Sequence, residues 1–324
     1  METSAIRIHE HGGTEVMRQE SVSLPAPGAG EVLVKNRAIG VNFIDVYHRI
    51  GLYPAALPAT LGMEGAGEVE AVGAGVENFT PGARVGYCVG GLGSYAEYRL
   101  ISAEALIALP DDIDFEQAAA VLLKGMTVEY LIRRLYTVRA GDMVLWHAAA
   151  GGVGLIACQW LKQIGATVIG TAGDAEKAEL AKSYGCEHVI LYKEEDTAAK
   201  VREITGGKGV IVAYDSVGES TFDATLNSLS PRGMFVSFGN ASGAVSPFAP
   251  SLLAQKGSLF FTRPTLMAYC SPPDDMRTSA DALFFAMRAG LHPIIGKTLP
   301  LAEAAEAHRA LEARETRGAT VMCP

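Results

Sequence analysis

A glycine-rich turn between an apolar strand and an apolar helix is the feature that most restricts how this chain can fold. Residues 145–160 read LWHAAAGGVGLIACQW. The surrounding sequence alternates segments with strand and helix character. Strands are expected over 142–148, 166–172, 188–192, 209–216 and 233–239, and helices over 154–165, 174–185 and 219–230. Strands that alternate with helices of this length build βαβ units around a parallel sheet, so this part of the chain predicts a doubly wound α/β domain.

The turn itself suits a dinucleotide. The pattern G-x-G-x-x-G places Ala149, Gly151 and Gly154 at its three glycine positions. Glycine at the middle position lets the backbone approach a pyrophosphate, and glycine at the third lets the helix pack closely on the strand. Because the N–H groups at a helix start favour an anion, we expect a dinucleotide-binding Rossmann domain rather than a turn that serves packing alone.

The end of the second strand of this domain bears on which dinucleotide binds. An acidic residue there would bind the ribose 2′-hydroxyl of NAD, but the position holds Gly173, and Lys177 follows in the next helix. A lysine suits a 2′-phosphate, so the spacing favours NADPH. Asp174 could still reach a ribose, or it could cap the helix and leave Lys177 as a solvated lysine. We expect its carboxylate to point at the helix amides.

Charge, cysteine content and composition restrict the function classes. A net charge of −9 over 324 residues argues against general binding of nucleic acid or anionic membranes. No apolar run reaches the ~18 residues of a membrane span, and the first residues do not read as a signal peptide. The five cysteines are scattered without a CxxC pair, which predicts a reducing cytoplasm without disulfides or structural zinc.

The first third of the chain differs from the alternating region. Short valine- and glycine-rich runs predict antiparallel strands at 31–43, 65–75, 82–87 and 94–101. Residues 115–135 then show the spacing of a helix. A chain of this length, with 49% hydrophobic residues, is expected to form two domains.

Six segments together resemble the zinc-independent NADPH:quinone oxidoreductases, the zeta-crystallin-like group of the medium-chain dehydrogenase/reductase superfamily. They are GVNFIDVYHRIGLYP (40–54), LLKGMTVEYLIRR (122–134), HAAAGGVGLIACQW (147–160), YDSVG (214–218), VSFGNASG (236–243) and KGSLFFTRP (256–264). The resemblance implies an α/β protein, with a β-rich catalytic domain, a doubly wound Rossmann domain and a cleft between them. We expect residues 1–124 and 272–324 to form the catalytic domain and residues 125–271 the Rossmann domain.

The resemblance also implies that no metal is required. Zinc-containing relatives place a cysteine where this chain has Asn42 and a histidine where it has Met63. Neither an amide nor a thioether suits Zn²⁺ as thiolate and imidazole do. Among the seven histidines, only His9 and His11 stand at a close spacing.

Family positions carry over to this chain where the motifs match. On the catalytic-domain side, near the nicotinamide, they are Asn42, Phe43, Ile44 and Asp45. In the Rossmann domain they are Tyr130, Gly152, Val153, Gly173, Asp174, Lys177, Tyr192, Ser216, Val217, Phe238, Gly239, Asn240, Ala241, Arg263, Pro264 and Thr265. Arg317 is assigned to the adenine phosphate end of the cofactor.

Tyr47 and Tyr53 are the candidate substrate residues, with Asn42 as the third catalytic candidate. Aromatic rings that carry hydroxyls suit both stacking on a planar quinone and a hydrogen bond to its oxygen. The alternative is that one tyrosine only packs between the domains. Lys124 and Thr127 are either ligands or residues of the helix start.

The expected reaction is NADPH-dependent reduction of a quinone, with the protein supplying orientation and a cleft that limits water. The residues do not distinguish hydride transfer from one-electron reduction. Two alternatives remain: NADPH-dependent reduction of activated C=C bonds in enones or enals, which requires a proton for carbon, and NADPH binding without catalysis. The partners expected are a small-molecule quinone and a second copy of the chain. The apolar segment 257–264 would be an exposed sheet edge unless it paired in a homodimer.

Overall fold

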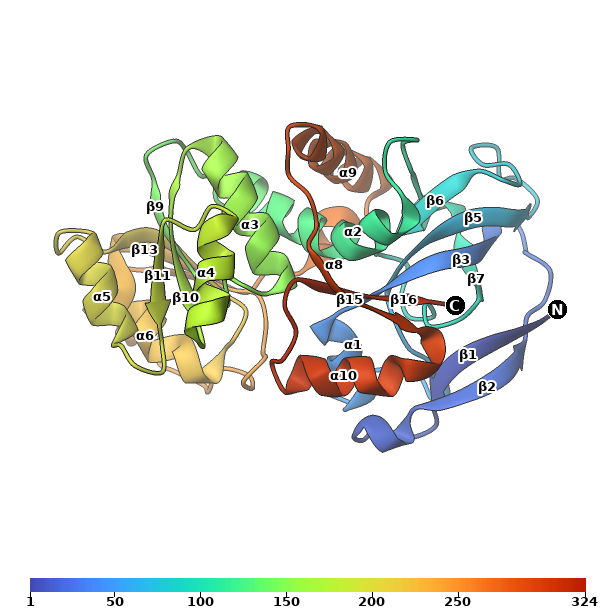
Figure 1. Ribbon diagram of the computed structural model, residues 1–324, viewed down its shortest axis with the longest axis horizontal. Helices are drawn as coiled ribbons and strands as arrows, with labels where there is room; N and C mark the ends of the chain where they lie inside the picture. The colour runs from blue at the N-terminus through green and yellow to red at the C-terminus, as the bar shows by residue number, and fades with distance from the viewer. The chain divides into compact units, whose positions relative to one another are not determined.

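The computed structural model describes all 324 residues, which divide into two compact units. The first unit comprises Met1–Met126, Tyr269–Phe285 and His292–Pro324, and the second comprises Thr127–Ala268 and Ala286–Leu291. Figure 1 shows the elements coloured in chain order. None of the helices combines the length and the apolar character that crossing a bilayer requires.

The second unit is built on a six-stranded parallel sheet. Its strands are β9 (Met143–Trp146), β10 (Thr167–Ala172), β11 (His188–Leu191), β12 (Val210–Asp215), β13 (Leu229–Ser237) and β14 (Phe260–Thr262). Their order across the sheet is β11-β10-β9-β12-β13-β14. The winding reverses between β9 and β12, which is the arrangement of a Rossmann domain and confirms the predicted doubly wound sheet.

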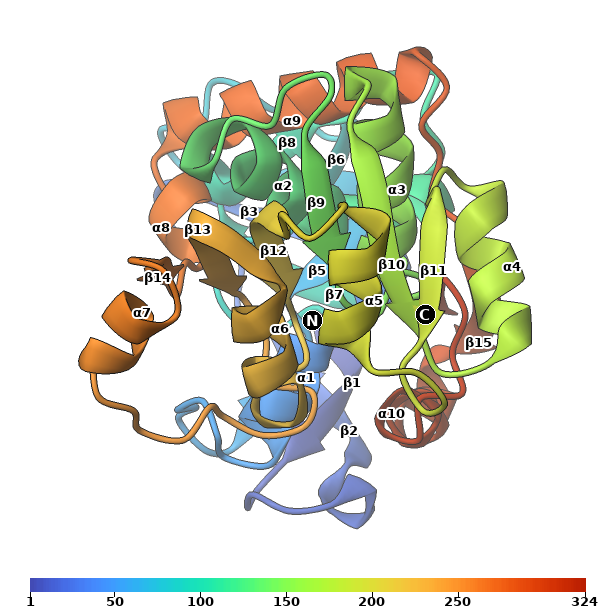
Figure 2. The ribbon, with the colours of Figure 1, turned by 90° about the vertical axis from the view of Figure 1, so that its left-hand side faces the viewer.

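Helices cover both faces of this sheet. They are α3 (Gly152–Ile164), α4 (Ala175–Ser183), α5 (Thr197–Ile204), α6 (Phe222–Ser228) and α7 (Ser251–Gln255). α3 packs with α4 and α5 packs with α6, and Figure 2 shows the two pairs on opposite sides of the sheet. Because both faces are covered, the strands are almost continuously apolar, and Leu145, Ile169 and Phe235 are fully buried in the core.

The first unit is rich in strands. They are β1 (Glu2–Ile8), β2 (Arg18–Ser23), β3 (Glu31–Val41), β4 (Ala59–Thr60), β5 (Glu64–Val72), β6 (Arg84–Tyr87), β7 (Tyr98–Ser102), β8 (Ile107–Ala108), β15 (Ile295–Pro300) and β16 (Ala319–Cys323). The larger sheet has the order β15-β16-β3-β5-β6-β8, with β7 also paired to β3, and the smaller has the order β2-β1-β4. All pairs except β15 with β16 are antiparallel, as predicted for a β-rich domain.

The helices of the first unit come from distant parts of the chain. They are α1 (Phe43–Arg49), α2 (Phe115–Glu129), α8 (Leu266–Cys270), α9 (Pro273–Arg288) and α10 (Ala304–Glu312), of which α2, α8 and α9 extend past the division between the units. A π-helical segment, Tyr130–Leu135, continues α2. Short 3₁₀ turns occur at Thr14–Val16, Ala103–Ala105, Glu219–Thr221 and Leu301–Glu303.

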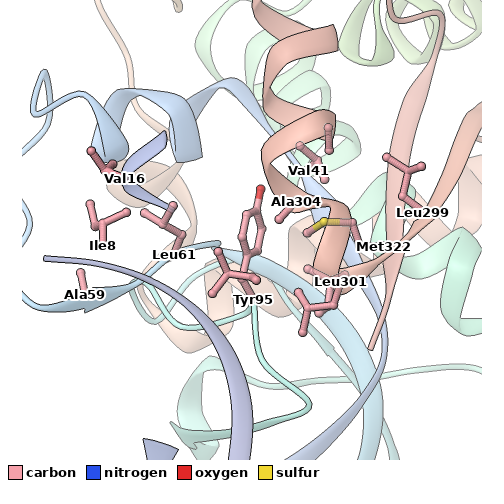
Figure 3. Packing of buried hydrophobic residues seen from close by; sticks show 13 residues of the cluster. Ile8, Val16, Val41, Ala59, Leu61, Tyr95, Leu299, Leu301, Ala304 and Met322 are labelled. Carbon is pink, nitrogen blue, oxygen red and sulfur yellow. The ribbon is translucent and has the colours of Figure 1, made fainter. Parts of the chain in front are cut away.

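The carboxy-terminal residues complete the core of the first unit. Figure 3 shows the buried ring of Tyr95 close to Leu61, Leu301 and Ala304. β16 pairs with β3, and Met322 on β16 is buried in the same cluster. Residues near the end of the chain therefore hold elements from its first hundred residues in place.

Candidate active site

Most of the predicted cofactor residues follow the parallel strands of the second unit directly. Gly173, Asp174 and Lys177 follow β10, and Tyr192 follows β11. The others come after β9, β12, β13 and β14 and are Gly152, Val153, Ser216, Val217, Phe238, Gly239, Asn240, Ala241, Arg263, Pro264 and Thr265. Because all six strands run in the same direction, the fold brings these residues to one edge of the sheet, where open α/β sheets bind their ligands.

The turn after β9 has the form that a pyrophosphate requires. Gly151 is the N-cap of α3, and no side chain caps the amides of that helix. A Cβ on Gly151 would lie 3.2 Å from the carbonyl oxygen of Ala148, and one on Gly154 would collide with it. Ala148 itself has a φ of 56°, so the chain turns sharply at this point. A bare helix N-terminus in a tightly packed turn fits an anionic group.

β10 is followed by Gly173, which has no side chain, and by Asp174, whose carboxylate points to the start of α4. The Asp174 carboxylate accepts the backbone N–H of Lys177 at 2.8 Å, which confirms that it caps α4. A Cβ on Gly173 would lie 3.0 Å from the hydroxyl of Tyr192, whose side chain is partly exposed. Gly173 therefore lies next to the hydroxyl of Tyr192 and just before α4, whose first turn contains Lys177.

A buried polar network that sequence reasoning missed lies at the ends of β9, β10 and β12. The two ring nitrogens of His147 lie 3.2 Å and 2.9 Å from the hydroxyls of Thr171 and Thr225. Thr225 in turn lies 3.0 Å from a carboxylate oxygen of Asp215, whose other oxygen accepts the N–H of Val217 at 2.7 Å. Burial lowers the pKa of His147, so this neutral imidazole helps to hold the loop that carries the predicted cofactor residue Val217.

In the first unit, Asn42 belongs to a buried cluster centred on Glu64. One Glu64 oxygen accepts from the Asn42 amide at 2.8 Å and from the Lys124 ammonium at 3.1 Å, and the other accepts the backbone N–H of Leu123 at 2.7 Å. A Cβ on Gly40 would collide with the carboxylate, so glycine makes room for it. Glu64 is completely buried and Lys124 is 5% exposed. The sequence signal for Glu64 was a charged residue inside the glycine-rich run GMEGAG.

Asp45 lies at the end of a second buried chain of hydrogen bonds. Arg49 can only donate, so Nδ1 of His308, 3.2 Å from its guanidinium, is an acceptor and Nε2 carries the hydrogen. Nε2 lies 2.9 Å from the Tyr95 hydroxyl, which donates to Oδ2 of Asp45 at 3.0 Å. Oδ2 also accepts the N–H of Asn42 at 2.8 Å, whereas Oδ1 has no hydrogen-bond partner.

The buried hydrogen-bond chain contains two groups, Asp45 and His308, whose pKa values shift in opposite directions. Burial raises the pKa of Asp45 to about 7, against the lowering effects of its Asn42 and Tyr95 hydrogen bonds and of the Lys124 charge. Burial and the charge of Arg49 lower the pKa of His308 to about 3. The carboxyl group that the resemblance assigned to the cofactor is fully buried, and it caps its own helix.

Tyr47 and Tyr53 form one aromatic pair. Their ring centroids are 5.2 Å apart in an edge-on arrangement, and the Tyr53 N–H donates to the Tyr47 carbonyl at 3.1 Å. Phe43 extends the group, with its ring centroid 6.0 Å from that of Tyr47, and Ile44 beside it is half-buried. Tyr47 is buried, and Tyr53, which lies beyond the end of α1, is half-buried; both belong to the first unit.

Tyr130 and Arg317 complete the predicted set of residues. Tyr130 is buried at the start of the π-helical segment, and Arg317 is exposed in the loop before β16. Asn42 and Met63 are both buried, and no three histidine, cysteine, aspartate or glutamate side chains come together as a metal site would require. All five cysteines are free thiols.

Two family profiles match the chain. Residues 152–283 match the family described as zinc-binding dehydrogenase, and residues 28–111 match the GroES-like domain of alcohol dehydrogenases.

Individual relatives match nearly the whole chain. The quinone oxidoreductase of Pseudomonas aeruginosa is 51% identical over 98% of this chain and 99% of its own length. A 2-haloacrylate reductase from a Burkholderia species is 46% identical over 98% of both chains. The crystal structure of Escherichia coli quinone oxidoreductase complexed with NADPH has 45% identity and a TM-score of 0.97, over 99% of this chain and 100% of that one.

Proposed function

Because this chain belongs to the quinone oxidoreductases of the medium-chain dehydrogenase/reductase superfamily, we propose that it is an enzyme that reduces a quinone with NADPH. The observation that carries the proposal is the 51% identity with a quinone oxidoreductase over nearly the whole of both chains. The turn after β9 supports the cofactor, since its capless helix start fits a pyrophosphate.

When bound, NADPH supplies the electrons and the hydrogen for the reduction. The residues of this chain bind and orient the reactants. The amides at Gly152 and Val153 hold the pyrophosphate, and Lys177 receives the 2′-phosphate beside Tyr192. Tyr47 and Tyr53 contact the flat ring of the quinone and offer hydroxyls to its oxygen. Asn42, whose amide donates to Glu64, is the N-cap of α1, the helix that carries Tyr47.

The two expected domains have different proposed roles. We assign catalysis to the β-rich domain, residues 1–124 and 272–324, and dinucleotide binding to residues 125–271. Asn42, Phe43, Ile44 and Asp45 are assigned to the nicotinamide end of the cofactor, and Arg317 to its adenine phosphate end.

A second candidate is the reduction of activated C=C bonds, which the 46% identity with a 2-haloacrylate reductase favours. Mixing the protein and NADPH with 1,4-naphthoquinone, 2-chloroacrylate or an enone, and following NADPH absorbance, separates the candidates. Oxidation with the quinone alone supports the first candidate, and oxidation with an alkene alone supports the second. NADPH binding without oxidation by any of the three would contradict both.

The enzyme is further proposed to work without a metal, because an amide and a thioether at positions 42 and 63 are poor zinc ligands. Dialysis against a chelator should leave activity intact, and metal analysis should find no stoichiometric zinc. Activity that is lost with the metal and restored by zinc would contradict this.

We also propose a cytoplasmic homodimer. β14 is an edge strand of the parallel sheet, and the Phe260 side chain on it is 59% exposed. Pairing of this edge with a second copy covers the strand and the ring together. Sedimentation at micromolar concentration should show a dimer that the substitution Phe260→Glu dissociates. The free, mostly buried thiols suit a reducing compartment.

A further inference from the structure

The Lys124 ammonium is a buried cation that the protein satisfies only in part. It has three N–H bonds, and its one protein acceptor is the Glu64 oxygen at 3.1 Å. Its side chain is 6% exposed, so water has little access to the other two N–H bonds. An ammonium in such a place is costly unless something accepts from it.

Glu64 does not explain why the lysine is there. Its carboxylate already accepts the Asn42 amide at 2.8 Å and the Leu123 N–H at 2.7 Å, so neutral donors serve both of its oxygens. A buried ion pair that served stability alone could be replaced by apolar residues at little cost. Lys124 therefore needs Glu64 as its hydrogen-bond acceptor, whereas Glu64 would still have two hydrogen-bond donors without Lys124.

The position of the ammonium connects it to the proposed substrate residues. Asn42 and Lys124 donate to the same oxygen of Glu64, so the two nitrogens lie within two hydrogen-bond lengths of each other. Asn42 begins α1, which carries Tyr47, and Tyr53 follows that helix. All of these residues belong to one compact unit.

We propose that Lys124 is a catalytic residue whose unfilled N–H bonds bind the carbonyl oxygen of the quinone and stabilise the negative charge that develops on it. This inference rests on the proposed function. In the reaction the quinone gains two electrons and one hydrogen, all supplied by NADPH, which leaves as NADP⁺. The transferred hydrogen forms an O–H bond at one carbonyl oxygen, and both C=O double bonds become C–O single bonds as the ring becomes aromatic. The other oxygen holds the negative charge beside the ammonium until it takes a proton from the solvent. Lys124 ends the cycle in the protonation state in which it began.

The test uses two readouts on the full-length protein. In the double variant Lys124→Met with Glu64→Gln, no lone carboxylate is left buried, and Lys124→Gln serves as a second variant that keeps a neutral donor. Removing one donor of this kind lowers kcat by on the order of 100-fold, so we expect that loss with 1,4-naphthoquinone and an NADPH Kd within ~2-fold of native. Arg99→Met is the matched control, since it removes another buried cation of the same unit, whose guanidinium donates to the carbonyls of Gly90, Gly91 and Leu92. We expect this control to keep kcat within ~3-fold at a temperature where circular dichroism shows all variants folded.

The second readout needs no turnover. 4-Nitrophenol absorbs in the visible when ionised, and its phenolate mimics the reduced quinone oxygen. The native protein should bind the phenolate at least ~10-fold more tightly than either Lys124 variant does, as one charge-assisted hydrogen bond provides. Binding of the neutral phenol should change little.

The possible outcomes separate this inference from the proposed function. Quinone turnover that survives the loss of Lys124, or phenolate binding that is equal in native and variant proteins, overturns the role of Lys124 and leaves the proposed function standing. If the native protein does not reduce quinones but loses phenolate binding in the variants, the proposed function fails and the oxyanion site stands. Absence of both native activities overturns both.

Discussion

Asparagine in place of Asp45 should make the stability of the first unit rise more steeply with pH than it does in the native protein, where the contributions of Asp45 and His308 oppose each other. Burial raises the pKa of Asp45 from 3.8 to about 7, and burial with the Arg49 charge lowers that of His308 from 6.5 to about 3. Between about pH 4 and 6.5 the folded chain holds a proton on Asp45 that the unfolded chain releases, so stability falls as pH rises. It lacks a proton on His308 that the unfolded chain binds, so stability rises by the same rule.

The two effects nearly cancel in the native protein. Each contributes a slope of about 1.4 kcal/mol per pH unit, one negative and one positive. The groups that shift Asp45 are Asn42, Tyr95, Lys124 and Glu64, and His308 is not among them. Removing one titration should therefore leave the other intact.

Asp45→Asn isolates the histidine, because its amide oxygen can still accept from Asn42 and Tyr95 while its NH₂ takes the place of the unpartnered Oδ1. The free energy of unfolding of this variant should rise by about 2 kcal/mol from about pH 4.5 to about pH 6.5. His308→Gln isolates the carboxyl group, and its free energy of unfolding should fall by a similar amount over the same range.

Denaturant titrations followed by far-ultraviolet circular dichroism measure both slopes. Tryptophan fluorescence is unsuitable, because Trp146 and Trp160 both lie in the second unit. Asp111→Asn makes the same chemical change on a fully exposed side chain and should track the native profile. Parallel profiles for the native protein and for the variants at positions 45 and 308 would refute the reasoning.

Three further predictions concern the cofactor and the substrate. Lys177→Ala should weaken NADPH binding by about 10- to 100-fold and leave NADH binding unchanged in paired titrations, because a charge-assisted hydrogen bond to the 2′-phosphate is lost; equal weakening of both would return Lys177 to a surface role. Gly152→Val should keep the native circular dichroism spectrum but abolish NADPH binding, since its methyl groups lie where the pyrophosphate is expected, and an unchanged Kd would mean that the turn serves packing only. Tyr47→Phe with Tyr53→Phe should raise KM for 1,4-naphthoquinone about 3- to 10-fold at constant NADPH Kd, and an unchanged KM would show that both phenols only pack.

The alternating part of the fold was predictable because its strands and its helices have distinct sequence patterns. Strands such as β9 are short buried apolar runs, and helices such as α3 are longer apolar segments that begin after a glycine turn. The helix α5, Thr197–Ile204, was not predicted, since Val201 and Ile204 are its only large apolar residues and it has no long apolar run. β13 begins four residues before the predicted start at 233, because tertiary pairing with β12 extends it past Pro231 and Arg232.

For some buried charged residues the sequence indicates that they are buried, and for others it does not. Glu64 interrupts GMEGAG and Lys124 interrupts VLLKGM, and a charge inside an apolar run needs a partner once the run is buried. The two residues stand 60 positions apart, and only Lys124 was considered as a candidate from the sequence; Glu64 and the pairing appear in the structure. His308 gives no such signal, because it lies in a helix whose sequence, EAAEAHRAL, alternates charge and alanine. Its burial arises only when α10 packs over Tyr95 and Arg49, and so its shifted pKa is a property of the tertiary structure alone.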